Sequence, residues 1–381
     1  MDHFGLDDEQ SALRETVAKF ASERVAPVIG EHYAKHEFPY DIVRQMGELG
    51  LFGLPFPVEI GGMGGDYAAL CVAIEELARI DSSVAITLEA AISLGAMPIW
   101  RFGTQEQKDR WLPDLVAGRK LAAFGLTEPG AGSDAGGTRT TAKLSDDGTE
   151  WIINGSKAFI TNSGTDITSM ITVTALTGPK EISSIIVPSG TPGLTVAPGY
   201  DKVGWCASDT HELHLDDVRV PVANLLGERG RGFAQFLAIL DEGRIAIAAL
   251  ATGNAQGCVD ESVKYAQARH AFGAPIASYQ GIQFMIAEME ERAHTARLAW
   301  RDAAARLVAG VDFKRAAAIA KLHASEAAVE NARVATQIHG GYGFMNEFPV
   351  ARFWRDAKIL EIGEGTSEIQ KLVIARDLGL K

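Results

Sequence analysis

The stretch "GFAQFLAILDEGRIAIAALATGNAQGCVDESVKYAQARHAFG", residues 232–273, decides the fold class of the C-terminal half. It is rich in alanine and contains no proline, so we expect one long helix that ends near Gly273 and Pro275. Residues 241–244 place charges inside this otherwise apolar helix. Because a helix that is buried on most faces seldom keeps unpartnered charges, this segment either borders a cavity or forms an internal ion network.

Two further helical segments follow, at residues 280–310 and 313–341, and glycines close both of them. A fourth helix is expected after Thr366, where Ser367 and Gln370 fit a capping box. Four long helices with short links predict a four-helix bundle over residues 229–381.

The segment before the bundle, residues 121–228, has a different texture. Threonine, isoleucine and valine are dense, and Asn154-Gly155 predicts a hairpin turn between two β-prone runs. Residues 211–215 and 218–221 alternate with a period of two. Because no helical crossover separates these strands, we expect an antiparallel β-barrel or sandwich, the barrel being preferred.

Residues 1–120 predict an N-terminal helical domain. Leu13, Val17, Phe20 and Val25 recur at near-helical spacing, and Asp81 can cap a helix that runs toward Pro98. The predicted fold class is therefore α+β, with a helical domain, a β-barrel and a four-helix bundle in that order along the chain.

Composition excludes several classes of function. The 381 residues carry 36 Lys and Arg against 49 Asp and Glu, and the net charge of −13 argues against binding of nucleic acid or of an anionic membrane. Local cations can still hold an anionic substrate. The three cysteines are far apart, which fits a reduced, cytoplasmic compartment. The acidic N-terminus lacks the apolar region of a signal peptide, and we expect no membrane span.

The loop "LTEPGAGSDAGG", residues 126–137, contains Gly-x-Gly-x-x-Ala. A dinucleotide fingerprint needs a strand before this pattern and a helix after it, but residues 138–144 look like another strand, which argues against that fold. The loop still offers the hydroxyls of Thr127 and Ser133 and the N–H groups of its glycines to a ligand. From the residues alone, an ordinary barrel turn is the better explanation of this loop.

Three other patterns leave alternatives open. Arg269 could bind a phosphate through its guanidinium fork, or it could only stabilise the end of a helix. Gly340 and Gly341 fit either a close approach to a ligand or a helix-ending turn. His211 and His214 would point to opposite faces of a strand, and we expect no metal site.

Taken together, these segments resemble the acyl-CoA dehydrogenase family over essentially the whole chain. The resemblance rests on six motifs in the family's order, and these are "FGLTEPGAGSD" (124–134), "NGSKAFITNSG" (154–164), "SDTHELHLDDVRVP" (208–221), "RHAFGAPIASYQGIQFMIAEM" (269–289), "QIHGGYGF" (337–344) and "EGTSEIQ" (364–370). The family's domain order matches the order predicted above.

The resemblance implies FAD as cofactor and an acyl-CoA thioester as substrate. Residues matching the part of the family motif that runs along the flavin are Phe124, Leu126, Thr127, Gly132 and Ser133, and those matching the cover of its ring are Phe159, Ile160 and Thr161. Residues matching the diphosphate and adenosine site are Arg269, Ala271, Phe272, Tyr279, Gln280, Gln337, Ile338, Gly340 and Gly341, completed by Thr366 and Glu368. Some of these come from a neighbouring subunit in the family, which implies a homo-oligomer, usually a tetramer.

The substrate side is implied in the same way. Ser133, Asp241 and Arg244 match segments near the acyl-CoA, and the Gly365 N–H would hold the thioester oxygen. Glu364 matches the catalytic base: it would take the α-proton while the β-hydrogen leaves as hydride to the flavin N5, which gives the trans-2-enoyl-CoA. A pocket poor in water would raise the pKa of this carboxylate toward neutral pH.

Three positions bear on the assignment. The family often has Tyr before the base, where this chain has Gly363, which would widen the acyl end of the pocket. Phe159 stands where Trp often covers the flavin, and it keeps an apolar cover without an N–H donor. Some branches place the base one residue before the arginine that matches Arg244, but Gly243 stands there and leaves the role to Glu364.

The leading hypothesis is thus an acyl-CoA dehydrogenase that passes electrons to an electron-transfer flavoprotein. The alternatives are an oxidase of the same fold that uses O2 and a non-catalytic relative. Oxidases of this fold often carry an additional C-terminal domain, whereas a non-catalytic relative would be expected to lose Glu364 or to gain a basic surface. The length, branching or aromatic character of the acyl group does not follow from the sequence.

Overall fold

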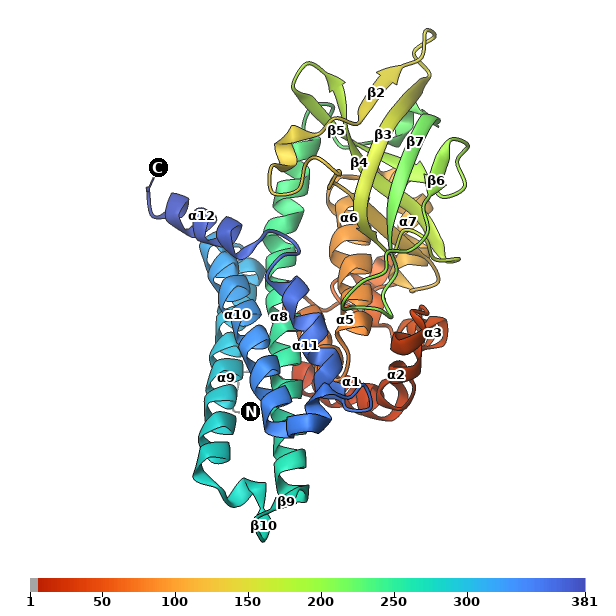
Figure 1. Ribbon diagram of the computed structural model, residues 1–381. Helices are drawn as coiled ribbons and strands as arrows, with labels where there is room; N and C mark the ends of the chain where they lie inside the picture. Colours follow the sequence, from red (N-terminus) through yellow and green to blue (C-terminus); the bar gives the residue numbers. More distant parts are fainter. Residues whose placement is uncertain (1–5, 381) are drawn as a thin grey trace.

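The computed structural model describes residues 6–380 and shows three regions in chain order (Figure 1). The first region is helical, as predicted, and Asp81 caps α5 by accepting hydrogen bonds from the N–H groups of Ser83 and Val84. Its elements are α1 (Asp8–Phe20), the π-helical turn η1 (Ala21–Val25), α2 (Ala26–Lys35), α3 (Tyr40–Glu48), α4 (Tyr67–Ala78), α5 (Ser82–Glu89), the π-helical turn η4 (Ala90–Ala96), α6 (Met97–Phe102) and α7 (Gln105–Val116).

The second region is a twisted sheet with strand order β6-β7-β3-β2-β4-β5-β8, and β1 pairs with β4 in parallel. Its strands are β1 (Leu121–Gly125), β2 (Thr141–Leu144), β3 (Glu150–Thr161), β4 (Thr168–Gly178), β5 (Glu181–Pro188), β6 (Leu194–Val196), β7 (Thr210–Pro221) and β8 (Leu225–Leu226). Most pairings are antiparallel, as expected. Among residues 6–380 the end strands β6 and β8 do not pair with each other, so the predicted closed barrel is not confirmed.

The predicted hairpin at Asn154-Gly155 is wrong. Both residues lie inside the single long strand β3, whose pairing with β7 shifts register between Ile153 and Gly155. A side chain at position 155 would meet Thr140, because an ideal Cβ there would lie 2.4 Å from Thr140 Oγ1. The glycine therefore marks a bulge where two backbones approach closely, not a turn.

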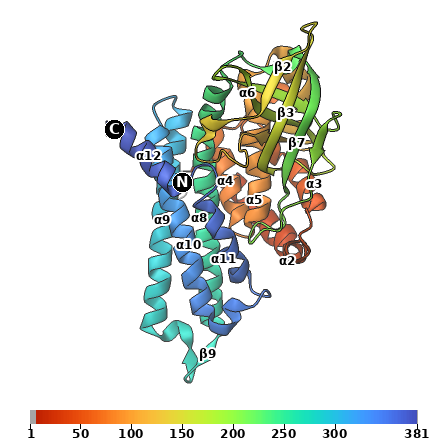
Figure 2. The ribbon, with the colours of Figure 1, turned by 45° about the horizontal axis from the view of Figure 1, so that its top comes forward.

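The third region is a helical bundle, in which α8 (Gly232–Ala268), α9 (Gln280–Val308), α10 (Lys314–His339) and α11 (Pro349–Leu360) lie side by side (Figures 1 and 2). The sequence interpretation missed α11 and took α12 (Ser367–Asp377) as the fourth long helix. The predicted capping box at Ser367 is also wrong, because Thr366 is the N-cap and its hydroxyl accepts from the Ile369 N–H at 3.3 Å. The short strands β9 (His270–Ala271) and β10 (Ala274–Pro275) follow α8 at the far end of the bundle.

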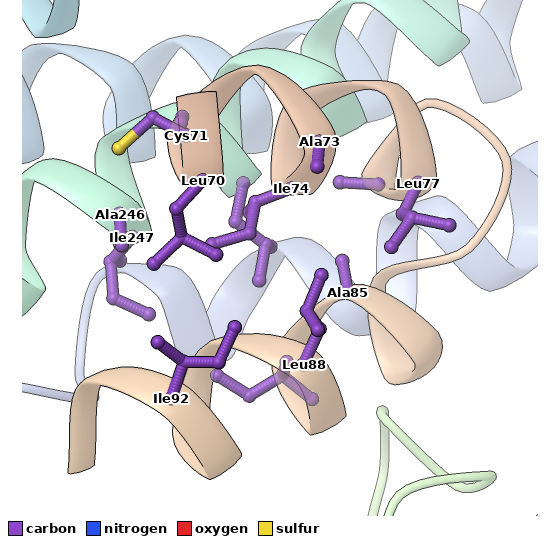
Figure 3. Packing of buried hydrophobic residues seen from close by; sticks show 14 of the residues in the cluster. Leu70, Cys71, Ala73, Ile74, Leu77, Ala85, Leu88, Ile92, Ala246 and Ile247 are labelled. Carbon is purple, nitrogen blue, oxygen red and sulfur yellow. The ribbon is translucent and has the colours of Figure 1, made fainter. Parts of the chain in front are cut away.

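One apolar core runs through both helical regions, and a second fills the sheet. Figure 3 shows the first core where Leu70 and Ile74 of α4 meet Leu88 of α5 and Ile247 of α8. The two helical regions, which are distant in sequence, are therefore packed as one body.

The helical stretch Ser82–Phe102 has the length and mean hydropathy, 1.4, that a membrane-spanning helix requires, although the sequence interpretation expected no such stretch. Inside the protein, 94% of its apolar window is buried. Buried core helices commonly have this length and hydropathy, so these two properties are weak evidence for a membrane span.

The packing between α8 and α4 depends on a glycine. An ideal Cβ at Gly253 would lie 2.2 Å from the backbone oxygen of Glu75, so Gly253→Ala should force the two helices apart and lower the free energy of unfolding by about 1–3 kcal/mol. Thermal unfolding measures this effect. Gly281→Ala, in α9, is the matched control: an ideal Cβ there meets no atom within 4 Å, and the variant should be unchanged or slightly more stable. Equal stability of the two variants would contradict the packing argument.

Candidate active site

The turn between α11 and α12 presents Glu364 in an unusual backbone conformation. Glu364 has a φ of 51° and Gly365 a φ of 95°, and a non-glycine residue in the left-handed region costs conformational energy. Lys321 Nζ and Gln370 Nε2 each donate to the Gly365 carbonyl at 2.8 Å. Contacts from α10 and α12 thus hold the strained turn in place.

The carboxylate of Glu364 is shielded from solvent. Both of its oxygens are buried, and among residues 6–380 only the Glu89 carboxyl is within hydrogen-bonding reach of them. Burial raises the pKa of Glu364 from 4.5 to about 7, while hydrogen bonding with Glu89 and the charges of Lys321 and Arg244 act in the opposite direction. A carboxyl group with this pKa is suited to accept a proton near neutral pH.

Gly243 of α8 leaves the space that this carboxylate occupies. An ideal Cβ at position 243 would lie 2.3 Å from Glu364 Oε2, so the helix approaches the carboxylate more closely than a side chain would allow. The following residue of α8, Arg244, is buried and forms an ion pair with Asp241. Asp241 also contacts Lys314 Nζ at 3.1 Å. The ion-network interpretation of this charged segment is therefore confirmed, and the segment also lies beside Glu364.

The sequence interpretation missed two buried charged residues beside Glu364. Glu89, the last residue of α5, is fully buried. Burial raises its pKa well above the usual value, and the negative charge of the nearby Glu364 raises it further. Lys321 of α10 is fully buried, and burial lowers its pKa to about 8. A single charge within an apolar helical run is the signal that could have found both of them.

The residues predicted to run along the flavin lie where the sheet meets the bundle. Phe124 at the end of β1 stacks on Phe236 of α8, with 3.7 Å between ring centroids. The Thr127 carbonyl accepts from the Ala158 N–H at 2.9 Å, which ties the loop after β1 to β3. Leu126 is buried, while Gly132 and Ser133 are exposed.

The end of β3 presents an apolar ring outward. Phe159 has a φ of 60°, and 67% of its surface is exposed. The preceding strand residue, Ala158, and the following Ile160 are buried, and Thr161 is half-buried. The Phe159 ring stacks on the Tyr200 ring, with 5.2 Å between centroids, and this contact holds the exposed side chain in place.

A second group of predicted cofactor residues lies at the other end of α8. Arg269, Ile338, Gly340 and Gly341 line one open pocket of about 630 Å³. Ala271 and Tyr279 are joined by a 2.8 Å hydrogen bond from the tyrosine hydroxyl, and the neighbouring Phe272 is fully exposed. The remaining predicted residues of this group are Gln280, at the start of α9, and Gln337, near the end of α10.

The two groups cannot serve one dinucleotide within a single chain. Phe236 lies near the start of α8 and Arg269 directly after its end, and a helix of 37 residues is roughly 55 Å long. Thr366 and Glu368 lie at the start of α12, Thr366 as its N-cap and Glu368 in its first turn.

His211 and His214 lie on β7, as predicted. His211 contacts Asp209 through Nε2 and the Ala197 carbonyl through Nδ1, both at 2.6 Å, whereas His214 lies 3.8 Å from Glu212. Within residues 6–380 no group of three His, Cys, Asp or Glu side chains could hold a metal ion.

Comparison with known proteins matches three domain families in order along the chain. Residues 7–119 match the acyl-CoA dehydrogenase N-terminal domain, residues 123–218 the middle domain and residues 230–379 the C-terminal domain.

Three relatives show how far the similarity extends. The probable acyl-CoA dehydrogenase YngJ of Bacillus subtilis is 50% identical, and the alignment covers 99% of each chain. The structure of butyryl-CoA dehydrogenase from Megasphaera elsdenii has a TM-score of 0.95 at 42% identity and covers 99% of this chain and all of that one. An acyl-CoA dehydrogenase from Bacillus anthracis complexed with FAD has a TM-score of 0.93 at 34% identity and covers 99% of this chain and 68% of that one.

The raised pKa of Glu364 predicts a pH-dependent stability. The folded state binds this proton more tightly than the unfolded chain, so the stabilisation is complete below pH 4.5 and is lost as pH rises through about 7. Glu364→Gln imitates the protonated acid. Its stability gain over the wild type should be small in acid and should grow to as much as roughly 3 kcal/mol above pH 7.

Calorimetric unfolding temperatures of both proteins across this pH range measure the difference. Glu361→Gln, in the same turn, removes a carboxylate that forms an ion pair with Lys358 and serves as the control. The same pH-dependent gain in the control, or none in Glu364→Gln, would contradict the assignment of the raised pKa to Glu364.

Proposed function

Because this chain belongs to the acyl-CoA dehydrogenase family, which it matches over almost its whole length, we propose that it oxidises a short, straight-chain acyl-CoA thioester to the trans-2-enoyl-CoA, with FAD as cofactor. The observation that carries this proposal is the buried Glu364 carboxylate, which a strained turn holds beside α8 and whose pKa lies at about 7. General base catalysis at neutral pH needs these properties.

Glu364 takes the α-proton of the thioester. As the C–H bond breaks, charge develops on the thioester oxygen, and a hydrogen-bond donor must meet it there. The Gly365 N–H is the nearest candidate, because within the described chain it donates to no backbone carbonyl and its own carbonyl is already occupied by Lys321 and Gln370. The Gly365 N–H thus remains free to donate to the thioester oxygen.

The residues at the junction of sheet and bundle fit a flavin. The loop at Gly132 and Ser133 is exposed, and an ideal Cβ at Gly132 would meet no atom within 4 Å, which leaves its backbone open to a ligand. The exposed Phe159 ring supplies a flat apolar cover, with Ile160 and Thr161 beside it. When bound there, FAD would accept the β-hydrogen as hydride. The B. anthracis relative complexed with FAD supports this choice of cofactor.

Arg244 is the proposed anchor on the substrate side. Its guanidinium is buried and held by Asp241, while its Nε has no hydrogen-bond partner in the described part of the chain. A fixed guanidinium with a free donor can hold a polar group of the acyl-CoA. Ser133 would contribute a hydroxyl from the loop after β1.

A second copy of the chain would complete the cofactor site. The pocket at Arg269, Ile338 and Gly340 lies at the end of α8 opposite the flavin residues, and the fully exposed Phe272 stands beside it. A homo-oligomer, such as a tetramer, would bring this pocket of one subunit to the flavin end of another. We further propose that an electron-transfer flavoprotein is the electron acceptor, with O2 as the competing acceptor in the test below.

The first test is anaerobic reduction of the bound flavin by an acyl-CoA. The wild-type protein should purify with a flavin spectrum that bleaches on addition of butyryl-CoA. Glu364→Gln should keep the flavin spectrum but bleach at least about 100-fold more slowly, because it lacks the base. Glu361→Gln, whose carboxylate lies in the same turn, is the control and should bleach like the wild type.

Bleaching of Glu364→Gln at the wild-type rate would move the base elsewhere, and protein that cannot be loaded with FAD would overturn the proposed cofactor. Reoxidation of the bleached enzyme by air, compared with reoxidation by an electron-transfer flavoprotein, separates dehydrogenase from oxidase.

The acyl group is tested with a panel of short, branched, long and aromatic acyl-CoAs. Similarity to the butyryl-CoA dehydrogenase predicts the highest kcat/KM for short straight chains. At Gly363 an ideal Cβ would have only the Ile359 carbonyl within 4 Å, at 3.4 Å, so this side of the site has room. Gly363→Tyr should therefore lower kcat/KM for branched substrates more than for butyryl-CoA, whereas a long or aromatic acyl-CoA as the best substrate would refute the proposed chain length.

A further inference from the structure

A second buried carboxyl, Glu89, faces the proposed base. It is the last residue of α5, where the π-helical turn η4 begins, and none of its surface is exposed. Within residues 6–380 its hydrogen-bond partners are the Ser93 hydroxyl and the Glu364 carboxyl, and the Glu364 oxygens have no donor there besides Glu89. Each carboxyl is therefore the available partner of the other.

Two carboxylates cannot both ionise so close together in a site without water. The charges around the pair decide which one does. Lys321 of α10 and Arg244 of α8 act on Glu364 and favour its ionised form. Glu89 instead faces the neutral groups Tyr67, Cys71 and Ser93. The Ser93 hydroxyl can donate to a Glu89 carboxylate, but none of the three carries a compensating positive charge.

The protonation order follows from these surroundings. Burial and then the nearby Glu364 raise the pKa of Glu89 well above its ordinary value, whereas the pKa of Glu364 rises only to about 7. Above neutral pH, Glu364 is a carboxylate and Glu89 remains an acid with one O–H donor. A second acid near Tyr67 is Glu242 of α8. It forms an ion pair with Arg101 at 2.7 Å and so cannot serve as the neutral O–H donor in place of Glu89.

On the proposed function, with Glu364 as the base, we infer that Glu89 is a positioning residue for it: the neutral acid donates its O–H to one Glu364 oxygen and so directs the other toward the α-carbon of the substrate. During the reaction, the α-proton passes to Glu364, and its bonding electrons stay with the substrate. Glu89 keeps its own proton throughout.

The test compares Glu89→Ala with Glu89→Gln. The alanine variant removes the donor, whereas the glutamine variant keeps an N–H donor that cannot ionise. Loss of a hydrogen bond to the charged form of an acid raises its pKa, so the acidic limb of anaerobic bleaching by butyryl-CoA should move upward by about one pH unit in Glu89→Ala. In Glu89→Gln, the limb should stay at the wild-type pH. An unmoved limb in Glu89→Ala, or an equal shift in both variants, would overturn the inference.

Infrared spectroscopy gives a readout that does not depend on turnover. Well above pH 7, where buried acids with a pKa of about 7 such as Asp356 and Glu242 are ionised, the wild type and Glu364→Gln should both show the carbonyl stretch of a buried protonated carboxyl, and Glu89→Gln should lack that band. Persistence of the band in Glu89→Gln would contradict the inference, even if Glu89→Ala failed to fold.

The matched control is Asp356→Asn. Asp356 is another fully buried acid, and burial raises its pKa to about 7, but it belongs to a separate cluster with Tyr33 and Trp205. Its removal should leave the acidic limb where it is, and a shift equal to that of Glu89→Ala would count against a specific role of Glu89. If Glu364→Gln bleached normally, the proposed function itself would fail, and this outcome is separate from an unmoved limb in Glu89→Ala.

Discussion

Burial of the middle of α8 on all its faces is the constraint on which the rest of the structure depends. From residue 241 to 259 every residue of this helix is buried, and a mostly apolar stretch of this kind must be covered by other elements on every side. Helices α9, α10 and α11 cover it from the bundle, and α4 and α5 cover it from the N-terminal region. Glycines at 253 and 257 allow this cover to come close, because a Cβ at either would meet backbone oxygens of Glu75 or Arg79.

This covering is also what assembles the site. Glu364 comes from the turn after α11, Glu89 from α5, Lys321 from α10 and Gly243 from α8, and all four meet only because α8 is enclosed. Isolated domains would leave the Glu364 carboxylate in water, where its pKa would stay near 4.5 and the carboxylate would be a weak base. The shared core between regions that are distant in sequence is therefore a requirement of the chemistry, not only of stability.

Local sequence patterns predicted the helices and strands well where the deciding interactions join residues that are close in sequence. The α8 helix, the cap at Asp81 and the strand character of β7 follow from periodicity and hydrogen-bonding side chains. The failures arose where tertiary contact overrode a local signal. Asn154-Gly155 is a turn sequence, but close contact with Thr140 makes it a bulge within a strand. The short α11 was overlooked for another reason: Val350, Phe353, Ala357 and Leu360 do recur at helical spacing, but the helix is brief beside its long neighbours.

The candidate site divides in the same way. Glu364 and the loop from Phe124 to Ser133 were found through motifs, whereas Glu89 and Lys321 lie in helices whose local sequence reads as core. Their role depends on the balance between burial, which raises the pKa of Glu364, and nearby charges, which shift it. That balance arises between helices and cannot be read from a local pattern. Burial alone would keep Glu364 protonated at neutral pH, and exposure alone would make it too weak a base. Lys321 and Arg244 offset part of the cost of burial, so a chain with a net charge of −13 places two cations beside a buried carboxylate that must ionise to act as a base.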